Sequence, residues 1–165
     1  MSANMVGTLR IGHGYDVHAF APDRKLILGG VEIPHTQGLL GHSDADVLAH
    51  ALADAILGGV RGGDIGKLFP DDDPAYEGAD SLKLLARVVE VAREAGFELV
   101  DADCTVAAQA PKLAPYREEM RVRLARACSV DTSQVGVKAT TTERLGFVGR
   151  EEGIAAWAVV LMQAI

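Results

Sequence analysis

The sequence predicts a single α+β domain in which three helices pack on one face of a mixed β-sheet. A chain of 165 residues is long enough for one hydrophobic core. Its 48% apolar and 24% charged residues are typical of a soluble globular protein. Apolar residues recur with period two in some segments and near 3.6 in others, in the order β, ββ, α, α, β, α, β, β. We expect residues 1–8 to form a flexible leader and residues 9–165 to form the domain.

A strand, a hairpin and a helix are expected in the first part of the chain. Residues 9–20 alternate well enough for a strand, although the glycines weaken this assignment and are also compatible with something approaching the backbone. Residues 26–33 contain two short β-rich runs around a Gly-Gly pair, which predicts a hairpin. A helix is expected over 43–57, with Ser43 as its N-cap and Asp46 as the capping-box partner.

The second part of the chain begins with a long irregular segment, residues 61–78, which is rich in glycine, proline and acidic residues. A loop of this length inside a compact domain is usually functional or mobile. The elements expected after it are a helix from Asp80 or Ser81 to Gly96, a strand over 97–109, a helix over 116–128, and strands over 135–140 and 154–162.

The last expected strand is almost wholly apolar. If helices cover only one face of the sheet, the other face would expose this strand to water. Self-association would cover such a face, so we expect a homo-oligomer.

Composition restricts the class of partner. The net charge of −7 argues against nucleic-acid binding, and any phosphate would have to be met locally by a metal, backbone N–H groups or a few cations. No apolar run approaches membrane-spanning length, and no signal pattern opens the chain, so a cytoplasmic protein without membrane contact is expected. Cys104 and Cys128 lack metal-type spacing and are expected to be buried free thiols.

Three residues form a candidate metal site. Asp16 and His18 share one face of an expected strand, and His50 lies on the first long helix. Three ligands with one open coordination position are typical of catalytic zinc, and two imidazoles favour zinc over magnesium. Asp46 and Asp54 lie one helical turn on either side of His50 and are expected to orient its ring. Taken singly, each residue is equally compatible with an ordinary structural role.

Two further segments suggest phosphate binding. Thr140-Thr141-Thr142-Glu143 follows an expected strand, and its hydroxyls and carboxylate suit phosphates and a second, harder cation. Residues 108–113 form a similar strand end with one cation. An ordinary strand or connection explains each segment equally well. The sequence contains no Walker loop and no G-x-S-x-G elbow.

Taken together, several blocks resemble the 2-C-methyl-D-erythritol 2,4-cyclodiphosphate synthases of non-mevalonate isoprenoid biosynthesis. The resemblance is carried by residues 10–18, by 42–44 through His50, by 63–66 with 69–71, by 108–112, and by 138–143 with 145–147. It implies a homotrimer with its sheets facing the threefold axis and active sites between subunits. It also implies a lyase that converts 4-diphosphocytidyl-2-C-methyl-D-erythritol 2-phosphate into the cyclic diphosphate and CMP.

The resemblance also implies roles for individual residues. Asp16, His18 and His50 would bind zinc, Glu143 would bind magnesium or manganese, and His42 and Thr141 would support the transition state. The implied substrate-binding residues are Asp16, Val17, His18, His42, Ser43, Asp64, Ile65, Gly66, Phe69, Pro70, Asp71, Asp72 and Asp73, then Ala108, Gln109, Ala110, Pro111, Lys112, Leu113, Ala114, Thr140, Thr141, Thr142 and Glu143 in the cytidine and phosphate pocket of the neighbouring subunit, and finally Phe147 and Arg150.

Two alternatives remain open from the residues. One is a trimeric binding module without turnover, in which Phe147, Arg150 and Glu152 surround an axial cavity that holds an isoprenoid diphosphate. The other is a zinc-dependent phosphohydrolase that uses the same three ligands. Release of CMP without free phosphate separates the synthase from both.

Overall fold

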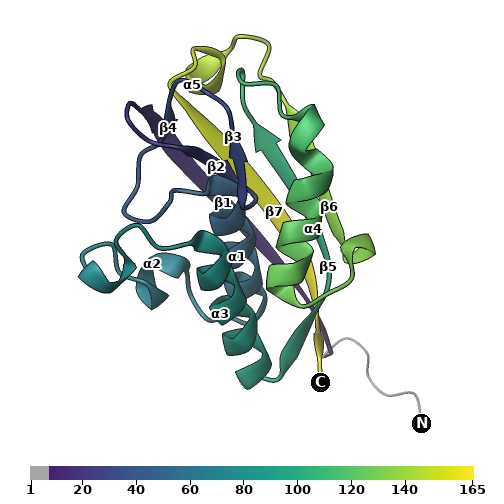
Figure 1. Ribbon diagram of the computed structural model, residues 1–165. Coiled ribbons are helices and arrows are strands. Elements are labelled where there is room, and N and C mark those ends of the chain that lie inside the picture. The colour runs from purple at the N-terminus through teal and green to yellow at the C-terminus, as the bar shows by residue number, and fades with distance from the viewer. Residues whose placement is uncertain (1–7) are drawn as a thin grey trace.

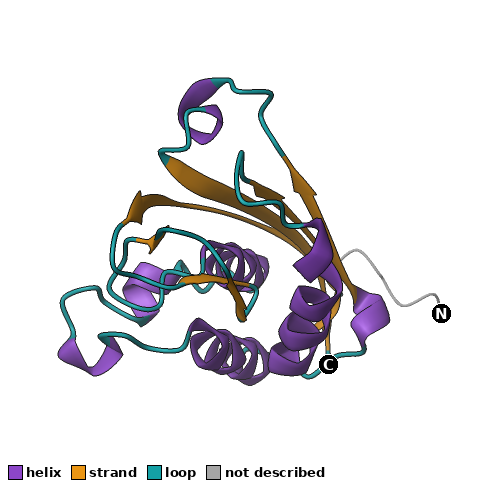
Figure 2. Cartoon of the chain, turned by 45° about the horizontal axis from the view of Figure 1, so that its top comes forward, coloured by secondary structure: helices purple, strands orange, loops and turns teal. Residues whose placement is uncertain are grey.

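The computed structural model describes residues 8–165 and contains a five-stranded sheet with three long helices on one side (Figures 1 and 2). The sheet order is β4-β1-β7-β5-β6, and β2 and β3 form a separate hairpin. The strands are β1 Leu9–Ala21, β2 Leu26–Leu28, β3 Val31–Ile33, β4 Gly38–Leu39, β5 Phe97–Ala107, β6 Val135–Thr140 and β7 Gly153–Ala164. The long helices are α1 Val47–Gly59, α3 Ser81–Glu94 and α4 Arg117–Cys128.

The sheet is mixed, as the sequence predicts. β7 pairs antiparallel with both β1 and β5, whereas β5 and β6 are parallel. The predicted hairpin over 26–33 is also present. Of the predicted leader, residues 1–7 lie outside the described part of the chain. Thr8 is described, and its carbonyl accepts a hydrogen bond from Ala164 N at 2.7 Å.

Helix α1 packs directly on the backbone of β1. A Cβ atom on Gly12 would lie 1.8 Å from the carbonyl oxygen of Ala55, and one on Gly14 would lie 1.9 Å from that of Ala51. Only glycine allows so close an approach. The approach expected at these glycines is therefore confirmed, and α1 is the segment that makes it. Asp16 and His18 continue the same face of β1 toward the start of α1.

The core lies between the sheet and the helices. Helix α1 is buried along almost its whole length, and it packs on β1 and β7 of the sheet and against α3. The largest fully buried side chains include Leu28, Ile33, Leu48, Leu52, Ile56, Leu85 and Leu124. Cys104 and Cys128 are buried free thiols, as predicted, and burial raises the pKa of each to about 12.

The start of α1 differs from the prediction. Ser43 is not the N-cap, because the helix begins at Val47 and Asp46 caps it by accepting a hydrogen bond from Ala49 N at 3.0 Å. Two observations explain the shift. Ala45 has a left-handed φ of 57°, which a helix cannot include, and Asp46 also accepts from Gly29 N and Gly30 N in the hairpin turn.

Short elements escaped the sequence prediction. The segment 61–78 contains the four-residue helix α2 Ile65–Leu68 and a 3₁₀ turn, Pro74–Tyr76. Further additions are β4, the helix α5 Gly146–Gly149 and the 3₁₀ turns Ala114–Tyr116 and Thr132–Gln134. None of these is long enough to show a hydrophobic period.

The sheet face opposite the long helices is apolar and open in the single chain. Ile11, Tyr15, Trp157 and Val159 are exposed there, with Ile11 reaching 70% exposure. Tyr15 and Trp157 are register partners in β1 and β7, and their ring centroids lie 5.3 Å apart. The open apolar face expected from the last strand is therefore present. Across residues 8–165, no helix combines the length and hydropathy that membrane crossing requires.

Candidate active site

Three side chains converge where β1 meets the first turn of α1. His18 Nε2 lies 3.0 Å from Asp16 Oδ2, and His50 Nδ1 lies 3.1 Å from the same oxygen. The two ring nitrogens are 3.2 Å apart. The sequence predicted this grouping, and within residues 8–165 it is the only set of three or more His, Cys, Asp or Glu residues whose ligand atoms come together in this way.

Hydrogen bonds to the remaining ring nitrogens orient both imidazoles. His18 Nδ1 lies 2.7 Å from the carbonyl oxygen of Leu40, which only accepts, so this nitrogen carries a proton and donates. His50 Nε2 lies 2.8 Å from Ser81 Oγ and 3.2 Å from Ser43 Oγ. In the neutral His18 ring, the nitrogen that faces Asp16 is then left with a free lone pair, whereas the serine hydroxyls can either donate to His50 Nε2 or accept from it.

The donor set fits a divalent cation. A carboxylate oxygen and two imidazole lone pairs are all acceptors, and at separations of 3.0–3.2 Å they need a shared proton or a metal ion between them. Two nitrogen ligands and one oxygen ligand match catalytic zinc sites, which keep a further position open. The site therefore suits a divalent metal, and the donor types favour zinc.

In the metal-free protein, protons take the place of that cation. Burial alone would raise the pKa of Asp16, but the hydrogen bonds from His18 and His50 outweigh it and lower this pKa to about 2. Burial would lower the pKa of His18, yet the hydrogen bond to Asp16 prevails and raises it. Both shifts favour the charged forms, as expected for a cluster built around a positive charge.

Asp46 and Asp54 do not orient His50, contrary to the sequence prediction. Asp46 turns toward the hairpin and accepts from Gly29 N at 2.9 Å, and Asp54 accepts from Ile65 N at 2.8 Å at the start of α2. Helical spacing alone placed them beside His50, whereas contacts with other segments hold them elsewhere. The serine hydroxyls take over the orienting role.

A pocket of about 210 Å³ lies over the metal-binding residues. Its lining joins β1, the start of α1, α2 and the loop that follows. It includes nine of the predicted site residues: Asp16, His18, His42, Ser43, His50, Ile65, Gly66, Phe69 and Asp71. Of the other predicted residues in this region, Asp64 caps α2, and the carbonyl of Asp73 lies 2.9 Å from His42 Nε2. Pro70 and Asp72 belong to the same loop but do not line the pocket, and Val17 is exposed.

A second pocket, of about 240 Å³, lies at the ends of β5 and β6. It is lined by Ala108, Gln109, Pro111, Lys112, Leu113, Ala114, Ala139, Thr140 and Thr141. The two segments that the sequence analysis associated with phosphate therefore meet in one cavity. Gln109 Oε1 also accepts from Arg144 N at 3.1 Å, which links the two segments just past the strand ends.

The other predicted residues of this second pocket lie at its edge. Thr142 Oγ1 donates to the carbonyl of Leu145 at 2.7 Å, and Glu143 is exposed with a left-handed φ of 53°. Ala110 lies in the turn that carries the lining residues. The two pockets share no lining residue, and β7 separates β1 from β5 in the sheet. A single chain thus carries two separate pockets.

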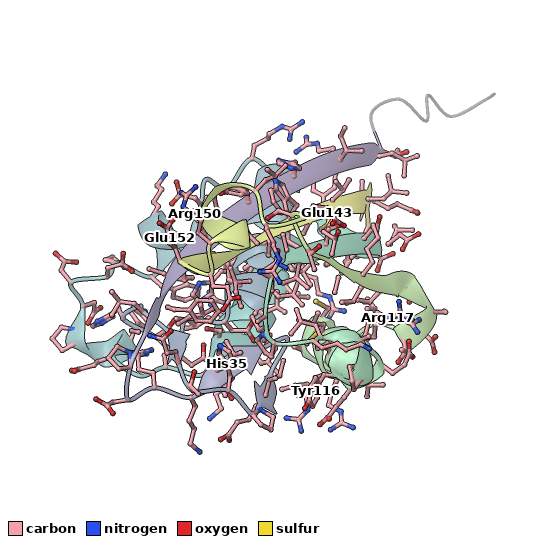
Figure 3. The ribbon with its side chains drawn as sticks, turned by 90° about the horizontal axis from the view of Figure 1, so that it is seen from above. His35, Tyr116, Arg117, Glu143, Arg150 and Glu152 are labelled. Carbon is pink, nitrogen blue, oxygen red and sulfur yellow. The ribbon has the colours of Figure 1, made fainter. Side chains whose placement is uncertain are left out.

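Phe147 and Arg150 lie beyond the sheet, in and just after α5. Phe147 is 38% exposed. Arg150 forms an exposed ion pair with Glu152 at 3.1 Å, and Figure 3 shows these two side chains together, away from Tyr116 and Arg117 of the α4 region. No described contact joins them to either pocket.

Sequence reasoning missed two parts of the metal site. Ser81 and the carbonyl of Leu40 hold the imidazoles, but neither lies near His18 or His50 in the chain. The sequence marks Ser81 only as a possible helix start. A backbone carbonyl carries no sequence signal, and a buried serine at a helix start is not distinguishable from a cap without coordinates.

Comparisons with known proteins agree with this geometry. The family model described as YgbB family matches residues 9–163. The chain is 63% identical over 154 residues to the 2-C-methyl-D-erythritol 2,4-cyclodiphosphate synthase of Geobacillus kaustophilus, covering 93% of this chain and 98% of that protein. Among solved structures it resembles the bifunctional IspDF of Campylobacter jejuni, with a TM-score of 0.92 and 46% identity over 95% of this chain and 42% of that one. It also resembles IspF of Plasmodium falciparum in a CDP complex, with a TM-score of 0.83 and 32% identity over 95% and 97% of the two chains.

Proposed function

The chain belongs to the YgbB family, and on that premise we propose that it is a cyclising phosphorus–oxygen lyase. It converts 4-diphosphocytidyl-2-C-methyl-D-erythritol 2-phosphate into 2-C-methyl-D-erythritol 2,4-cyclodiphosphate and CMP in non-mevalonate isoprenoid biosynthesis. The observation that carries this proposal is the convergence of Asp16, His18 and His50 on one point beside a polar pocket. That arrangement occurs in a chain 63% identical to a named synthase.

The reaction requires positioning more than a protein nucleophile. An oxygen of the substrate's own 2-phosphate attacks the β-phosphorus, the bond between that phosphorus and the bridging oxygen breaks, and CMP leaves with the electron pair. Because the nucleophile belongs to the substrate, the enzyme has to fold the substrate into line and offset its negative charge. The buried Ser43 and Ser81 fit this account, because their hydroxyls hold the His50 imidazole and are not needed as nucleophiles.

Asp16, His18 and His50 are proposed to hold zinc, and Glu143 to hold magnesium or manganese. When bound, such ions supply Lewis acidity at phosphate oxygens and offset the charge of the departing group. Asp16 and the two imidazoles direct their ligand atoms at one point, because Leu40 and Ser81 hold the other ring nitrogens in place. His42, fixed by the carbonyl of Asp73, and Thr141 are proposed to support the transition state.

The two pockets divide the substrate between them in this proposal. The erythritol part lies in the pocket over the metal ligands, with the loop that contains Phe69 and Asp71. The cytidine and its phosphates lie in the second pocket, between residues 108–114 and 140–143. The Plasmodium falciparum structure is a CDP complex, which supports a cytidine diphosphate ligand for this fold.

We propose that the active assembly is a cytoplasmic homotrimer with the open sheet faces turned toward the threefold axis. The apolar face around Tyr15 and Trp157 supports this, because one chain leaves it exposed. The pocket for cytidine then comes from one subunit and the metal pocket from the next. Residues 9–165 are proposed to act as one domain. An isoprenoid diphosphate on the axis near Phe147 and Arg150 stays a prediction.

The decisive experiment supplies the purified protein with the cytidylated substrate and follows the phosphorus-31 spectrum. The synthase is expected to produce equal amounts of the cyclic diphosphate and CMP. Release of inorganic phosphate would instead indicate a phosphohydrolase, and binding without any spectral change would indicate a binding module. Either of those results would contradict the proposed reaction.

A further inference from the structure

We infer that Ser81 and Asp44 are positioning residues that hold His50 in the tautomer that binds the metal. The inference rests on the metal ligation proposed above and concerns a chain of three side chains, Asp44, Ser81 and His50, here called the Asp44–Ser81–His50 chain. It joins the segment before α1 to the first residue of α3.

The first link is the bond between His50 and Ser81. His50 Nε2 lies 2.8 Å from Ser81 Oγ, and Ser81 is 1% exposed, so this hydrogen bond is shielded from bulk water. A hydroxyl can donate or accept, and by itself it would allow either tautomer of the ring. The direction of this hydrogen bond therefore depends on what else Ser81 touches.

The second link sets that direction. Ser81 Oγ makes a very short contact with Asp44 Oδ1. The Asp44 carboxylate is already surrounded by donors, because it also accepts from Asp46 N at 3.1 Å and from Ser81 N at 3.1 Å. An ionised carboxylate only accepts, so the Ser81 hydroxyl donates its single proton to Asp44. Ser81 Oγ is then left to accept from His50.

The consequence reaches the metal site. With a proton fixed on Nε2, the neutral His50 ring has its lone pair on Nδ1, which faces Asp16 Oδ2 at 3.1 Å and His18 Nε2 at 3.2 Å. The other tautomer would place a proton where the ion has to bind. Loss of a partner that holds the second nitrogen of a metal-binding histidine typically lowers metal affinity about 10- to 100-fold.

Backbone hydrogen bonds hold the two ends of the Asp44–Ser81–His50 chain together. Asp44 N donates to the carbonyl of Ala79 at 3.0 Å, and Gly78 N donates to the carbonyl of His42 at 2.8 Å. These backbone bonds tie the segments before α1 and α3 together, and the two helices lie against each other (Figure 1). His50 is therefore positioned by α3 as well as by its own helix.

The test measures zinc affinity of metal-stripped protein by competition with a chromophoric chelator. Ser81→Ala removes the nearer of the two hydroxyls at His50 Nε2, the one whose direction Asp44 sets, and leaves only Ser43 Oγ at 3.2 Å. It is expected to weaken zinc binding about 10- to 100-fold. Asp44→Asn is expected to weaken it in the same direction, because an amide nitrogen beside Ser81 releases the hydroxyl to donate to His50. Asp80→Ala is the matched control: it removes the N-cap of the same helix, where Asp80 accepts from Leu82 N at 2.9 Å, but leaves the chain intact.

Zinc affinity within about twofold of the unaltered protein in both Ser81→Ala and Asp44→Asn would overturn the inference. An equal loss in Asp80→Ala would also overturn it, because the effect would then come from loosening of α3. If Ser81→Ala fails to fold, nitrogen-15 spectra of the unaltered metal-free protein, recorded at a pH where the His50 ring is neutral, decide. We expect His50 to keep its proton on Nε2, with slow exchange, and a proton on Nδ1 would reject the chain.

These outcomes separate the inference from the proposed metal site. Unaltered protein that binds no zinc would reject the ligand set itself. Unaltered protein that binds zinc, with Ser81→Ala and Asp44→Asn binding it equally well, would reject only the positioning role.

Discussion

His18 Nε2 lies 3.2 Å from His50 Nδ1, although the two residues are 32 positions apart in the chain. The contact depends on two separate features, the glycines that let α1 approach β1 and the hydrogen bonds that turn each ring. This distance restricts the chemistry of the site, because two imidazole lone pairs at that separation require a cation between them.

Replacing His50 by Ala should remove bound zinc and turnover together. The substitution deletes one of three ligands, so affinity should fall by more than about 100-fold, beyond the loss expected for an outer partner. Metal content of the purified variant and CMP release are the measurements. His35→Ala is the control, because His35 lies outside both pockets and its ring packs against Phe20. Full turnover by His50→Ala without bound metal would refute the zinc assignment.

Glu143→Gln should leave the zinc content unchanged while weakening the response to magnesium or manganese. Glu143 does not belong to the Asp16, His18 and His50 cluster, so its loss leaves those ligands intact. A carboxylate is a preferred ligand for hard cations and a neutral amide is weaker. Initial rates measured across a magnesium titration report the effect, and an identical titration curve would argue against the role.

Gly14→Ala should destabilise the fold severely. The added Cβ would lie 1.9 Å from the carbonyl oxygen of Ala51, a backbone atom that cannot rotate away, so we expect a loss of at least about 3 kcal/mol. Gly58→Ala is the matched control, since its Cβ would meet nothing closer than 3.6 Å and alanine favours the helix by about 0.5–1 kcal/mol. Urea unfolding of both variants gives the comparison. Equal stabilities would contradict the close packing of α1 on β1.

Asp16 should make the stability of the metal-free protein depend on acid pH. The pKa of its carboxyl is about 2 in the folded protein against 3.8 ordinarily, so the folded state binds this proton less tightly than the unfolded state. The resulting stabilisation, about 2 kcal/mol, is fully present above about pH 5 and is lost as the pH falls toward 2. The free energies of unfolding of the unaltered metal-free protein and of metal-free Asp16→Asn, measured between pH 6 and pH 2, should converge at the acid end. A constant gap between them would contradict this account.

Val159→Glu should break the proposed trimer. Val159 is 49% exposed on the open sheet face, and three buried carboxylates near one axis would be too costly to desolvate. Sedimentation should show the unaltered protein at three times the mass of one chain and the variant as a monomer with little activity. Lys83→Glu, which changes a charge on the opposite side of the molecule in the groove between α3 and α4, should remain trimeric. A monomeric unaltered protein would refute the assembly.

The long elements and the metal ligands were predictable because they leave local signals. Period-two and period-3.6 patterns identified the main strand segments, the hairpin and the three long helices, and the DVH spacing put Asp16 and His18 on one face of β1. The glycines in β1 also predicted the close approach to its backbone that α1 makes. In each case the information lies within a few residues of the feature.

The errors concern contacts made between distant segments. Asp46 fits a capping box by sequence, but the hairpin turn draws it into the N-cap position itself. Ser81 fits a helix cap, but the fold turns its hydroxyl toward His50, 31 positions away. A side chain's partner across the core depends on how whole elements pack, and no local spacing encodes it.

The candidate metal pocket and the proposed cytidine pocket lie on different strands of one chain, so a mutation can disable one and leave the other intact. A subunit that lacks His50 still offers an intact cytidine pocket, and a subunit with an obstructed cytidine pocket still offers intact metal ligands. In the proposed trimer, mixing two such inactive chains recreates a whole site at one of the junctions. Two dead alleles expressed together should therefore rescue growth that neither supports alone.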